Sequence, residues 1–178
     1  MKWMGACLVT LVCTGLGQHM ARDWRLRLKC LELLRQMMYL LKAEIIYGHT
    51  ALGEALRRVG ERCQKAEGER GLETMPLFFL SVAERIEQQE GESFSRIWQE
   101  ELERIKASPL KETDVSSLKN LGDHLGYLDL GMQERNLLLY LEQVDGQISF
   151  LKQNVRERTK LYTSLGIMGG LFLSIMMY

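Results

Sequence analysis

The residues of this chain that could do chemistry are three histidines, four cysteines and a run of glutamates near position 100. The histidines, His19, His49 and His124, lie far apart, and none belongs to an HExxH motif. Histidines that share a metal on one helix stand four residues apart, because that spacing brings both rings to one face. Only a fold that brings His49, Cys63 and His124 together would make a metal site. We therefore predict no metal and no cofactor.

The acidic run, Glu100, Glu101 and Glu103, is the second candidate. Paired carboxylates act as general acid and base when their surroundings separate their pKa values. Adjacent glutamates on a helix are more often a solvated face, however. The chain also has no Walker-type phosphate loop and no GxSxG nucleophile motif. These observations predict a protein that is not an enzyme.

The cysteines do not indicate a disulfide framework. Cys7 and Cys13 lie six residues apart in an apolar run, Cys30 and Cys63 fall within predicted helices, and no CxxC pair occurs. Because we expect the central part of the chain in a reducing compartment, we predict no disulfide there.

The elements that must position these side chains are predicted to be helices. The chain has two prolines, Pro76 and Pro109, and no segment keeps the alternation of a strand. Apolar residues instead recur at helical spacing; in the third helix they are Leu77, Leu80, Val82, Ala83 and Ile86. The fold class is all-α, an antiparallel bundle of about six helices, the first and last continuing into terminal apolar runs. The expected helices of the bundle span residues 23–47, 51–64, 74–89, 94–107, 114–125 and 129–160.

Polar residues mark the expected helix ends. Thr50, Ser93 and Asp129 are predicted N-caps, because their side chains can accept a hydrogen bond from the first turn of a helix. Gly126 is the predicted C-terminal stop of the fifth helix.

Two terminal runs, Trp3–Ala21 and Leu161–Tyr178, carry no charged side chain. Their 19 and 18 residues would form helices of roughly 28 and 27 Å. The hydrocarbon core of a bilayer is about 30 Å thick. The sequence therefore predicts transmembrane helices at residues 1–21 and 161–178, flanking a bundle domain of residues 22–160.

Charge beside these runs predicts their orientation. Lysine and arginine next to a span stay on the cytoplasmic side. Beyond Lys2, the basic residues near the runs all lie on their inner side: Arg22, Arg25, Arg27, Lys29, Lys152, Arg156, Arg158 and Lys160. We expect a cell-membrane protein with its central domain in the cytoplasm and both termini outside.

Two alternatives to the spans stay open. A signal peptide could end near Gly15–Gly17, which loosely fits a cleavage site, although the strongly basic residues that follow resist translocation. The second run could instead be a buried C-terminal core helix, because its length is at the short end for a span.

Small residues within the two runs could bring helices together. Gly166 and Gly170 form a GxxxG pair, and Cys13, Gly17 and Ala21 repeat a small residue every fourth position. Small residues at this spacing let helices approach closely in lipid. The runs are thus expected to pack either against each other or against a partner.

The balance of charge gives no reason to expect nucleic acid, because the formal net charge is zero. The charge is nevertheless uneven: residues 61–104, the acidic segment, hold eleven glutamates and six lysines or arginines, a net charge of −5. This segment is either a solvated helical surface or a docking surface for a partner.

Five features of the chain occur in a fixed order: the segment Glu44–Leu56, the segment Gly91–Phe94 with Trp98, the segment Leu125–Asp129 with Gln133, the closing Ser164–Gly166 with Gly169–Leu171, and the paired terminal runs. In these features the chain resembles the stage III sporulation protein AB family of endospore-forming bacteria. The resemblance covers nearly the whole chain. One departure is Ala51, where the family usually has proline.

The resemblance implies an integral membrane component of the channel between mother cell and forespore. It also implies a bundle like that of the platform protein in type II secretion and type IV pilus machines. The implied partners are a cytoplasmic ATPase, stage III sporulation protein AA, and other channel subunits; a homo-oligomer stays open. The alternative function is a two-span accessory subunit of an unrelated transporter or sensor.

The same features supply candidate docking residues: Glu44, Tyr47, Glu54, Asp129 and Gln133 around the first turn and the last helix, with Glu100 and Glu101 in the acidic segment. The alternative is structural. Large apolar residues of these segments would then belong to the core, and Asp129 would be an N-cap only. The core residues in that interpretation are Tyr47, Leu52, Leu56, Phe94 and Trp98.

Overall fold

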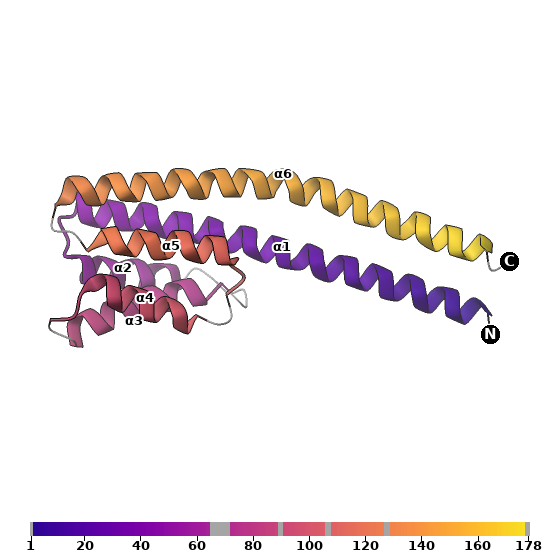
Figure 1. Cartoon of the computed structure of the whole chain (residues 1–178), viewed down its shortest axis with the longest axis horizontal. Coiled ribbons are helices and arrows are strands. Elements are labelled where there is room, and N and C mark those ends of the chain that lie inside the picture. Colours follow the sequence, from indigo (N-terminus) through magenta and orange to yellow (C-terminus); the bar gives the residue numbers. More distant parts are fainter. Residues whose placement is uncertain (1, 65–71, 89–90, 106–107, 127–128, 177–178) are drawn as a thin grey trace. The chain divides into compact units, whose positions relative to one another are not determined.

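The computed structural model describes residues 2–64, 72–88, 91–105, 108–126 and 129–176, and the backbone alone for 2–21, 155–167 and 169–176. All of its regular elements in these ranges are α-helices, which confirms the predicted all-α class (Figure 1). They are α1 (Lys2–Ile46), α2 (Leu52–Gln64), α3 (Thr74–Gln88), α4 (Phe94–Arg104), α5 (Glu112–Leu125) and α6 (Leu130–Met176).

The chain divides into two compact units. The first contains Met1–Leu28 and Ser149–Tyr178, and the second, which we call the bundle unit, contains Lys29–Ile148. The first and last helices each contribute to both units, whereas α2 to α5 lie entirely in the bundle unit. The predicted domain boundaries at residues 21 and 160 stay predictions.

Among the described residues, no helix combines the length and the apolar character needed to cross a membrane. The side chains of both predicted spans lie outside the described residues, except that of Met168. The same holds for the small residues Gly17, Ala21, Gly166 and Gly170 and for the basic residues Arg156, Arg158 and Lys160. Of the basic residues that follow the first apolar run, Arg22, Arg25 and Lys29 are exposed and Arg27 is half-buried.

The core of the bundle unit follows the predicted apolar periodicity. On α1 and α6 the buried side chains are spaced three or four residues apart, the spacing that puts them on one helical face. These side chains are Leu31, Leu34, Met38, Leu41 and Ile45 on α1 and Leu137, Leu141, Val144 and Ile148 on α6. Full burial of such a side chain stabilises the fold by about 1.5–3 kcal/mol.

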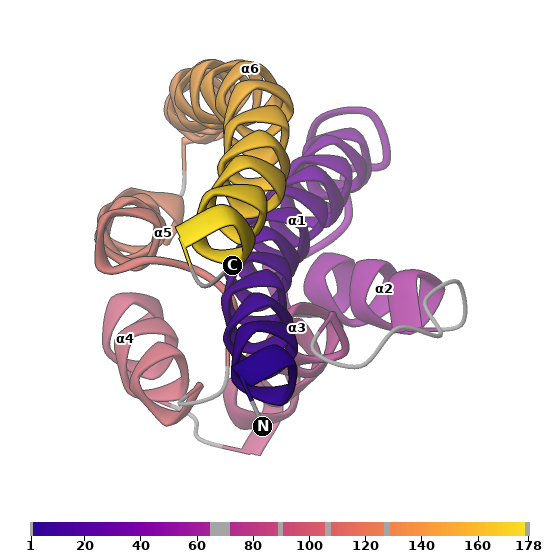
Figure 2. The same cartoon turned by 90° about the vertical axis from the view of Figure 1, so that its right-hand side faces the viewer.

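Ion pairs join α1 and α6 in antiparallel register. Lys42 Nζ lies 3.0 Å from Glu134 Oε1, and Arg35 pairs with Asp145. Because the earlier residue of α1 meets the later residue of α6, the two helices run in opposite directions within the bundle unit. The remaining helices pack in chain order, α2 on α3, α3 on α4 and α4 on α5 (Figures 1 and 2).

An aromatic cluster fills the space between α3, α4 and α5. Trp98 is fully buried, and its ring centroid lies 4.7 Å from that of Phe78, 5.5 Å from Phe94 and 6.0 Å from Phe79. Its indole Nε1 donates a hydrogen bond of 2.9 Å to the carbonyl oxygen of Leu118. A buried indole needs such a partner, since an unpaired donor away from water is destabilising.

Gly122 makes room for this tryptophan on α5. A Cβ atom at position 122 would lie 2.0 Å from Trp98 Cδ1, closer than any packed contact. Glycine is therefore required here by close approach and not by backbone conformation. We refer to Trp98, its three phenylalanine neighbours, Leu118 and Gly122 as the Trp98 cluster.

Two of the predicted helix caps are confirmed. Ser93 Oγ accepts a hydrogen bond from the backbone N–H of Arg96 at the start of α4. Asp129 Oδ1 accepts one of 3.0 Å from the N–H of Gly131 at the start of α6. Each satisfies a backbone donor that has no partner within its own helix.

The predicted cap at Thr50 is wrong. Helix α2 begins one residue later than expected, and the first helical hydrogen bond runs from Ala55 N–H to the carbonyl of Ala51. The Thr50 hydroxyl instead donates to Glu44 Oε2 at 3.2 Å. A carboxylate within reach draws the hydroxyl away from the helix end, and local sequence does not reveal that competition.

The start of α5 differs from the prediction, whereas its end at Leu125 and the stop at Gly126 are confirmed. The helix begins two residues early, at Glu112, and Asp114 Oδ2 accepts a hydrogen bond of 2.9 Å from the N–H of Lys111. Gly126 ends the helix with a φ of −75°, so no left-handed conformation calls for glycine. The reason is spatial, because a Cβ there would lie 3.0 Å from Phe94 Cβ.

The buried face of α3 is rotated from the expected one. Leu77 is exposed, whereas Phe78 and Phe79 are buried within the Trp98 cluster. The consecutive apolar residues around Pro76 fit more than one helical face, so periodicity alone could not choose between them.

Candidate docking site

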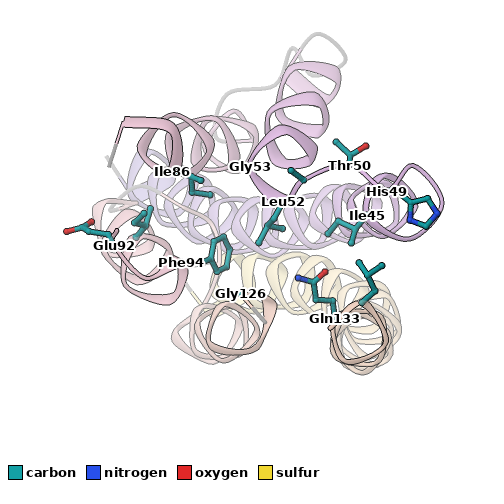
Figure 3. A pocket seen from close by; sticks show the side chains of 13 residues that line it. Ile45, His49, Thr50, Leu52, Gly53, Ile86, Glu92, Phe94, Gly126 and Gln133 are labelled. Atoms are coloured by element: carbon teal, nitrogen blue, oxygen red, sulfur yellow. The ribbon is translucent and has the colours of Figure 1, made fainter. Parts of the chain in front are cut away.

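Three segments that carry the family resemblance meet at one end of the bundle unit, around an open pocket of about 580 Å³ (Figure 3). We call it the loop-end pocket, because α1, α3 and α5 finish there and α2, α4 and α6 begin. Its lining residues are Ile45, His49, Thr50, Ala51, Leu52, Gly53, Ile86, Glu92, Phe94, Ile97, Gly126, Leu130 and Gln133.

The turn between α1 and α2 forms one wall of the pocket. The N–H groups of Tyr47 and Gly48 both donate to the carbonyl of Ala43 at 3.1 Å, which closes the end of α1. A Cβ at Gly48 would lie 2.6 Å from the Glu44 carbonyl oxygen, so only glycine fits. The next residue, His49, has a φ of 48°, in the left-handed region that few non-glycine residues adopt. The turn is therefore fixed by specific contacts.

Two predicted docking residues, Glu44 and Glu54, fasten this turn. Glu44 Oε2 accepts from the Thr50 hydroxyl at 3.2 Å and from Arg58 Nη1 at 3.3 Å. Arg58 Nε also donates to Glu54 Oε1 at 2.9 Å, and that hydrogen bond is the main cause of the raised pKa of Arg58. Glu44 thus joins α1 to α2 beside the pocket, and Glu54 holds Arg58 in place within α2.

Gln133 and Asp129 hold the opposite wall. Gln133 is buried, and its Nε2 donates a hydrogen bond of 2.9 Å to the carbonyl of Leu125 at the end of α5. Asp129 is exposed and caps α6. Gln133 therefore positions the start of α6 against the end of α5, and its side-chain donor is directed into the protein.

Some side chains at the loop end are exposed to solvent. Tyr47 is 76% exposed and Leu130 is 45% exposed, and His49 and Glu92 lie at opposite edges of the pocket in Figure 3. The interpretation of Tyr47 as a core residue is therefore wrong. Leu56 and Trp98 are fully buried, as that interpretation expected, whereas Leu52 and Phe94 are half-buried and line the pocket.

The predicted docking residues of the acidic segment are engaged in a network between α3 and α4. Arg85 donates to Glu101 Oε1 at 3.0 Å, to Glu100 Oε2 at 2.9 Å and to Glu92 Oε2 at 3.3 Å. Hydrogen bonds from Arg85, and then from Arg96, hold the pKa of Glu100 below its usual value.

Glu101 in this network is buried and also accepts a hydrogen bond of 2.6 Å from Arg104. Three arginines thus offset the three carboxylates in this part of the segment. Glu100 and Glu101 join helices here and do not form a bare acidic patch.

The candidate metal ligands are not brought together. His49 lines the pocket, Cys63 is buried on α2, and His124 is exposed near the end of α5. Among the described residues, no group of three histidine, cysteine or acidic side chains could hold a metal ion.

Sequence reasoning missed the apolar walls of the pocket, namely Ile86, Ile97 and Leu130. The only signal was indirect: the segments of the resemblance lie at helix boundaries, and in an antiparallel bundle alternate boundaries share one end. Nothing in the sequence indicates that these ends enclose a hollow.

The fold and the site define an all-α bundle protein with an open, largely apolar pocket where three helix connections meet. Comparison with known proteins gives the family. The family model for stage III sporulation protein AB matches residues 2–178, so the chain belongs to the stage III sporulation protein AB family, and the resemblance drawn from its sequence is confirmed.

Individual relatives agree with this assignment. The chain is 24% identical over 178 residues to stage III sporulation protein AB of Bacillus subtilis (strain 168), covering 99% of each chain. It is also similar to a solved structure of stage III sporulation protein AB, with a TM-score of 0.62 and 23% identity. That likeness covers 74% of this chain and 97% of the solved one, and it supports the helical bundle fold.

Proposed function

We propose that this protein is a non-enzymatic platform subunit of the channel between mother cell and forespore, and that its loop end docks a cytoplasmic secretion-type ATPase. The observation that carries the proposal is the convergence of three segments of the family resemblance on one pocket. Loops that carry function are typically held by a rigid scaffold. Here the hydrogen bond that Gln133 donates and those that Ser93 and Asp129 accept fix the helix ends around the pocket.

We place the docking surface at the loop end and not on the acidic segment. The reason is that Glu100 and Glu101 are already paired with arginines across α3 and α4. By contrast, Tyr47 is mostly exposed beside the pocket. Exposed aromatic side chains next to a pocket are frequent anchors of protein interfaces.

The same proposal includes two membrane spans, residues 1–21 and 161–178, with the bundle on the cytoplasmic side. The support comes from the uncharged terminal runs and from the basic residues on their inner flanks. Protease applied to the outside of intact cells is expected to leave the bundle uncut. Digestion of the bundle from outside would contradict the orientation.

Co-purification from membranes with the stage III sporulation protein AA ATPase tests the docking. The wild-type chain should retain the ATPase, and a mass measurement of the complex should give its stoichiometry. Tyr47→Ala is expected to weaken retention about tenfold by removing an exposed anchor. Tyr39→Ala is the matched control, because Tyr39 is also an exposed tyrosine but lies within α1, away from the turn between α1 and α2 that borders the pocket.

A charge-reversal variant separates the two docking surfaces. Glu84 and Glu103 are exposed residues of the acidic segment, so Glu84→Lys combined with Glu103→Lys would weaken binding if that segment were the contact. Our proposal expects retention within about twofold of wild type. A large loss in this variant together with normal retention by Tyr47→Ala would place docking on the acidic segment instead.

A further inference from the structure

The walls of the loop-end pocket are mostly apolar side chains. Its larger apolar side chains come from five helices: Ile45, Leu52, Ile86, Phe94, Ile97 and Leu130. No lysine or arginine is among the described residues that line it. Charged donors of that kind commonly hold phosphate and carboxylate ligands, and this lining offers an anionic small molecule such as a nucleotide no lysine or arginine partner.

Two glycines fix the shape of the pocket. A Cβ at Gly53 would lie 3.3 Å from Ile86 Cγ2, and one at Gly126 would lie 3.0 Å from Phe94 Cβ. Since Ile86 and Phe94 are themselves walls, a side chain at either glycine would displace a wall. The hollow is thus bounded by helices in close approach and is preformed.

The loop-end pocket is large enough to hold more than one side chain of a partner. Its volume of about 580 Å³ lies within the range of about 300–1,000 Å³ typical of ligand pockets. An amphipathic helix that docks in a groove inserts anchors spaced three or four residues apart. Two or three such anchors fit a pocket of this class, and the exposed Leu130 extends its apolar surface to the outside.

Charge at the edges favours a basic occupant. Glu92 lies at one edge, and its contact with Arg85, at 3.3 Å, is the longest of the three that Arg85 makes with carboxylates. Asp129, next to the wall residue Leu130, is exposed. A lysine or arginine flanking the apolar anchors would meet these carboxylates.

We propose that the loop-end pocket receives the apolar face of a short, basic amphipathic helix contributed by the docking ATPase, an inference that rests on the function proposed above. The helix inserts two or three apolar side chains between Phe94, Leu52 and Leu130. Its basic residues face Glu92 and Asp129.

Pocket-blocking variants of the full chain in nanodiscs test this with the purified ATPase as the probe. Ala51 is exposed and lines the pocket, so Ala51→Trp should fill it and weaken binding at least about tenfold. Thr113→Trp is the matched control, because Thr113 is exposed at the opposite end of α5; it should bind within about twofold of wild type. Circular dichroism checks that both variants keep the helical fold.

A second pair keeps the test valid if the tryptophan variant does not fold. Leu130→Glu puts a charge on the pocket wall, and the first turn of a helix tolerates an acidic residue. Leu139→Glu places the same change on an exposed position of α6 that does not line the pocket. We expect a loss of at least about tenfold for the first and little change for the second.

Photo-crosslinking identifies the occupant. With benzoylphenylalanine at position 130, the adduct should map to an ATPase segment that has apolar residues three or four apart and an adjacent lysine or arginine. An adduct on a second copy of this chain, or none on the ATPase, overturns the inference, as does measurable binding of ATP alone by this chain.

The outcomes separate the two proposals. If the wild-type chain binds the ATPase and Ala51→Trp and Leu130→Glu bind as well, the pocket inference fails while the platform function stands. If the wild-type chain does not bind the ATPase, the platform function fails and this inference fails with it.

Discussion

The Trp98 cluster and the loop-end pocket share the first turn of α4, but the cluster is tightly packed whereas the pocket is open. Phe94 belongs to both, because its ring lies 5.5 Å from that of Trp98 and its side chain also lines the pocket. On one side the packing leaves no room for a single carbon at Gly122, whereas on the other a hollow of about 580 Å³ stays open.

This contrast separates the motif residues that hold the fold from those that leave surface available. Apolar surface in contact with water is unfavourable by about 25 cal/mol per Å², so a wall such as Leu130 is not explained by stability of the isolated chain. Trp98 and Gln133 stabilise the scaffold, whereas Leu52, Phe94 and Leu130 shape a surface for a partner. Substitutions in the two regions test this division.

The largest effect should come from Trp98→Ala. Removing the indole leaves a cavity among three phenylalanines and removes the hydrogen bond from the indole to the carbonyl of Leu118. We expect the free energy of unfolding to fall by about 3–5 kcal/mol, measured by chemical denaturation of the full chain. A loss below about 1 kcal/mol would show that the cluster does not hold the bundle.

Gly122→Ala should have the next largest effect. The added methyl group would overlap the Trp98 ring, and overpacking of this kind destabilises by about 1–3 kcal/mol. Gly146→Ala is the matched control on α6, because a Cβ there meets nothing within 4 Å. That variant should gain about 0.5–1 kcal/mol, since alanine is the better helix former. Equal effects at the two positions would contradict the packing argument.

Gln133→Leu, at the start of α6, should give a loss no larger than that of Gly122→Ala. It removes the donor to the Leu125 carbonyl and leaves a buried acceptor unpaired, a loss of about 1–3 kcal/mol. Gln143→Leu, which breaks an exposed hydrogen bond to Ser117, should lose less. Thermal unfolding of both variants compares them directly; a greater loss at Gln143 would argue against the positioning role of Gln133.

The smallest effect is a pH dependence at the α4–α5 contact. Hydrogen bonds from Ser95 and Gln99 to Asp123 lower the pKa of this carboxyl. A carboxyl whose pKa is lower in the folded than in the unfolded protein stabilises the fold at pH values above its unfolded-state pKa of about 3.9. This stabilisation is lost as the pH falls through the folded-state pKa. Stability of wild type should therefore drop below about pH 4 more steeply than that of Asp123→Asn. Parallel curves would show that this contact contributes nothing.

Much of the fold was predictable from the sequence, because apolar spacing and capping residues are local signals. Ser93 and Asp129 act as the predicted caps, and the α1 and α6 faces are buried as expected. Thr50 was mispredicted because its hydroxyl has a competing acceptor, Glu44, six residues away. Capping rules based on neighbouring residues do not include a competing acceptor that the fold brings close.

The candidate site was predictable only in part. The segments around Tyr47 and Asp129 stand out in the sequence itself, but their meeting at one pocket depends on how six helix ends are arranged. Glu100 and Glu101 have the sequence pattern of a surface charge run and are instead paired with arginines from two helices. An ion pair between two helices cannot be predicted from the residue spacing within one of them.

Docking of the ATPase at the loop end is the proposal on which the functional interpretation depends. Hydrogen–deuterium exchange of the full chain in nanodiscs, with and without the ATPase, probes it without any substitution. We predict that protection gained on binding is concentrated in residues 44–53, 91–98 and 129–133. Protection confined to the outer faces of α2 and α3, or none at these three segments in a complex that forms, would contradict docking at the loop end.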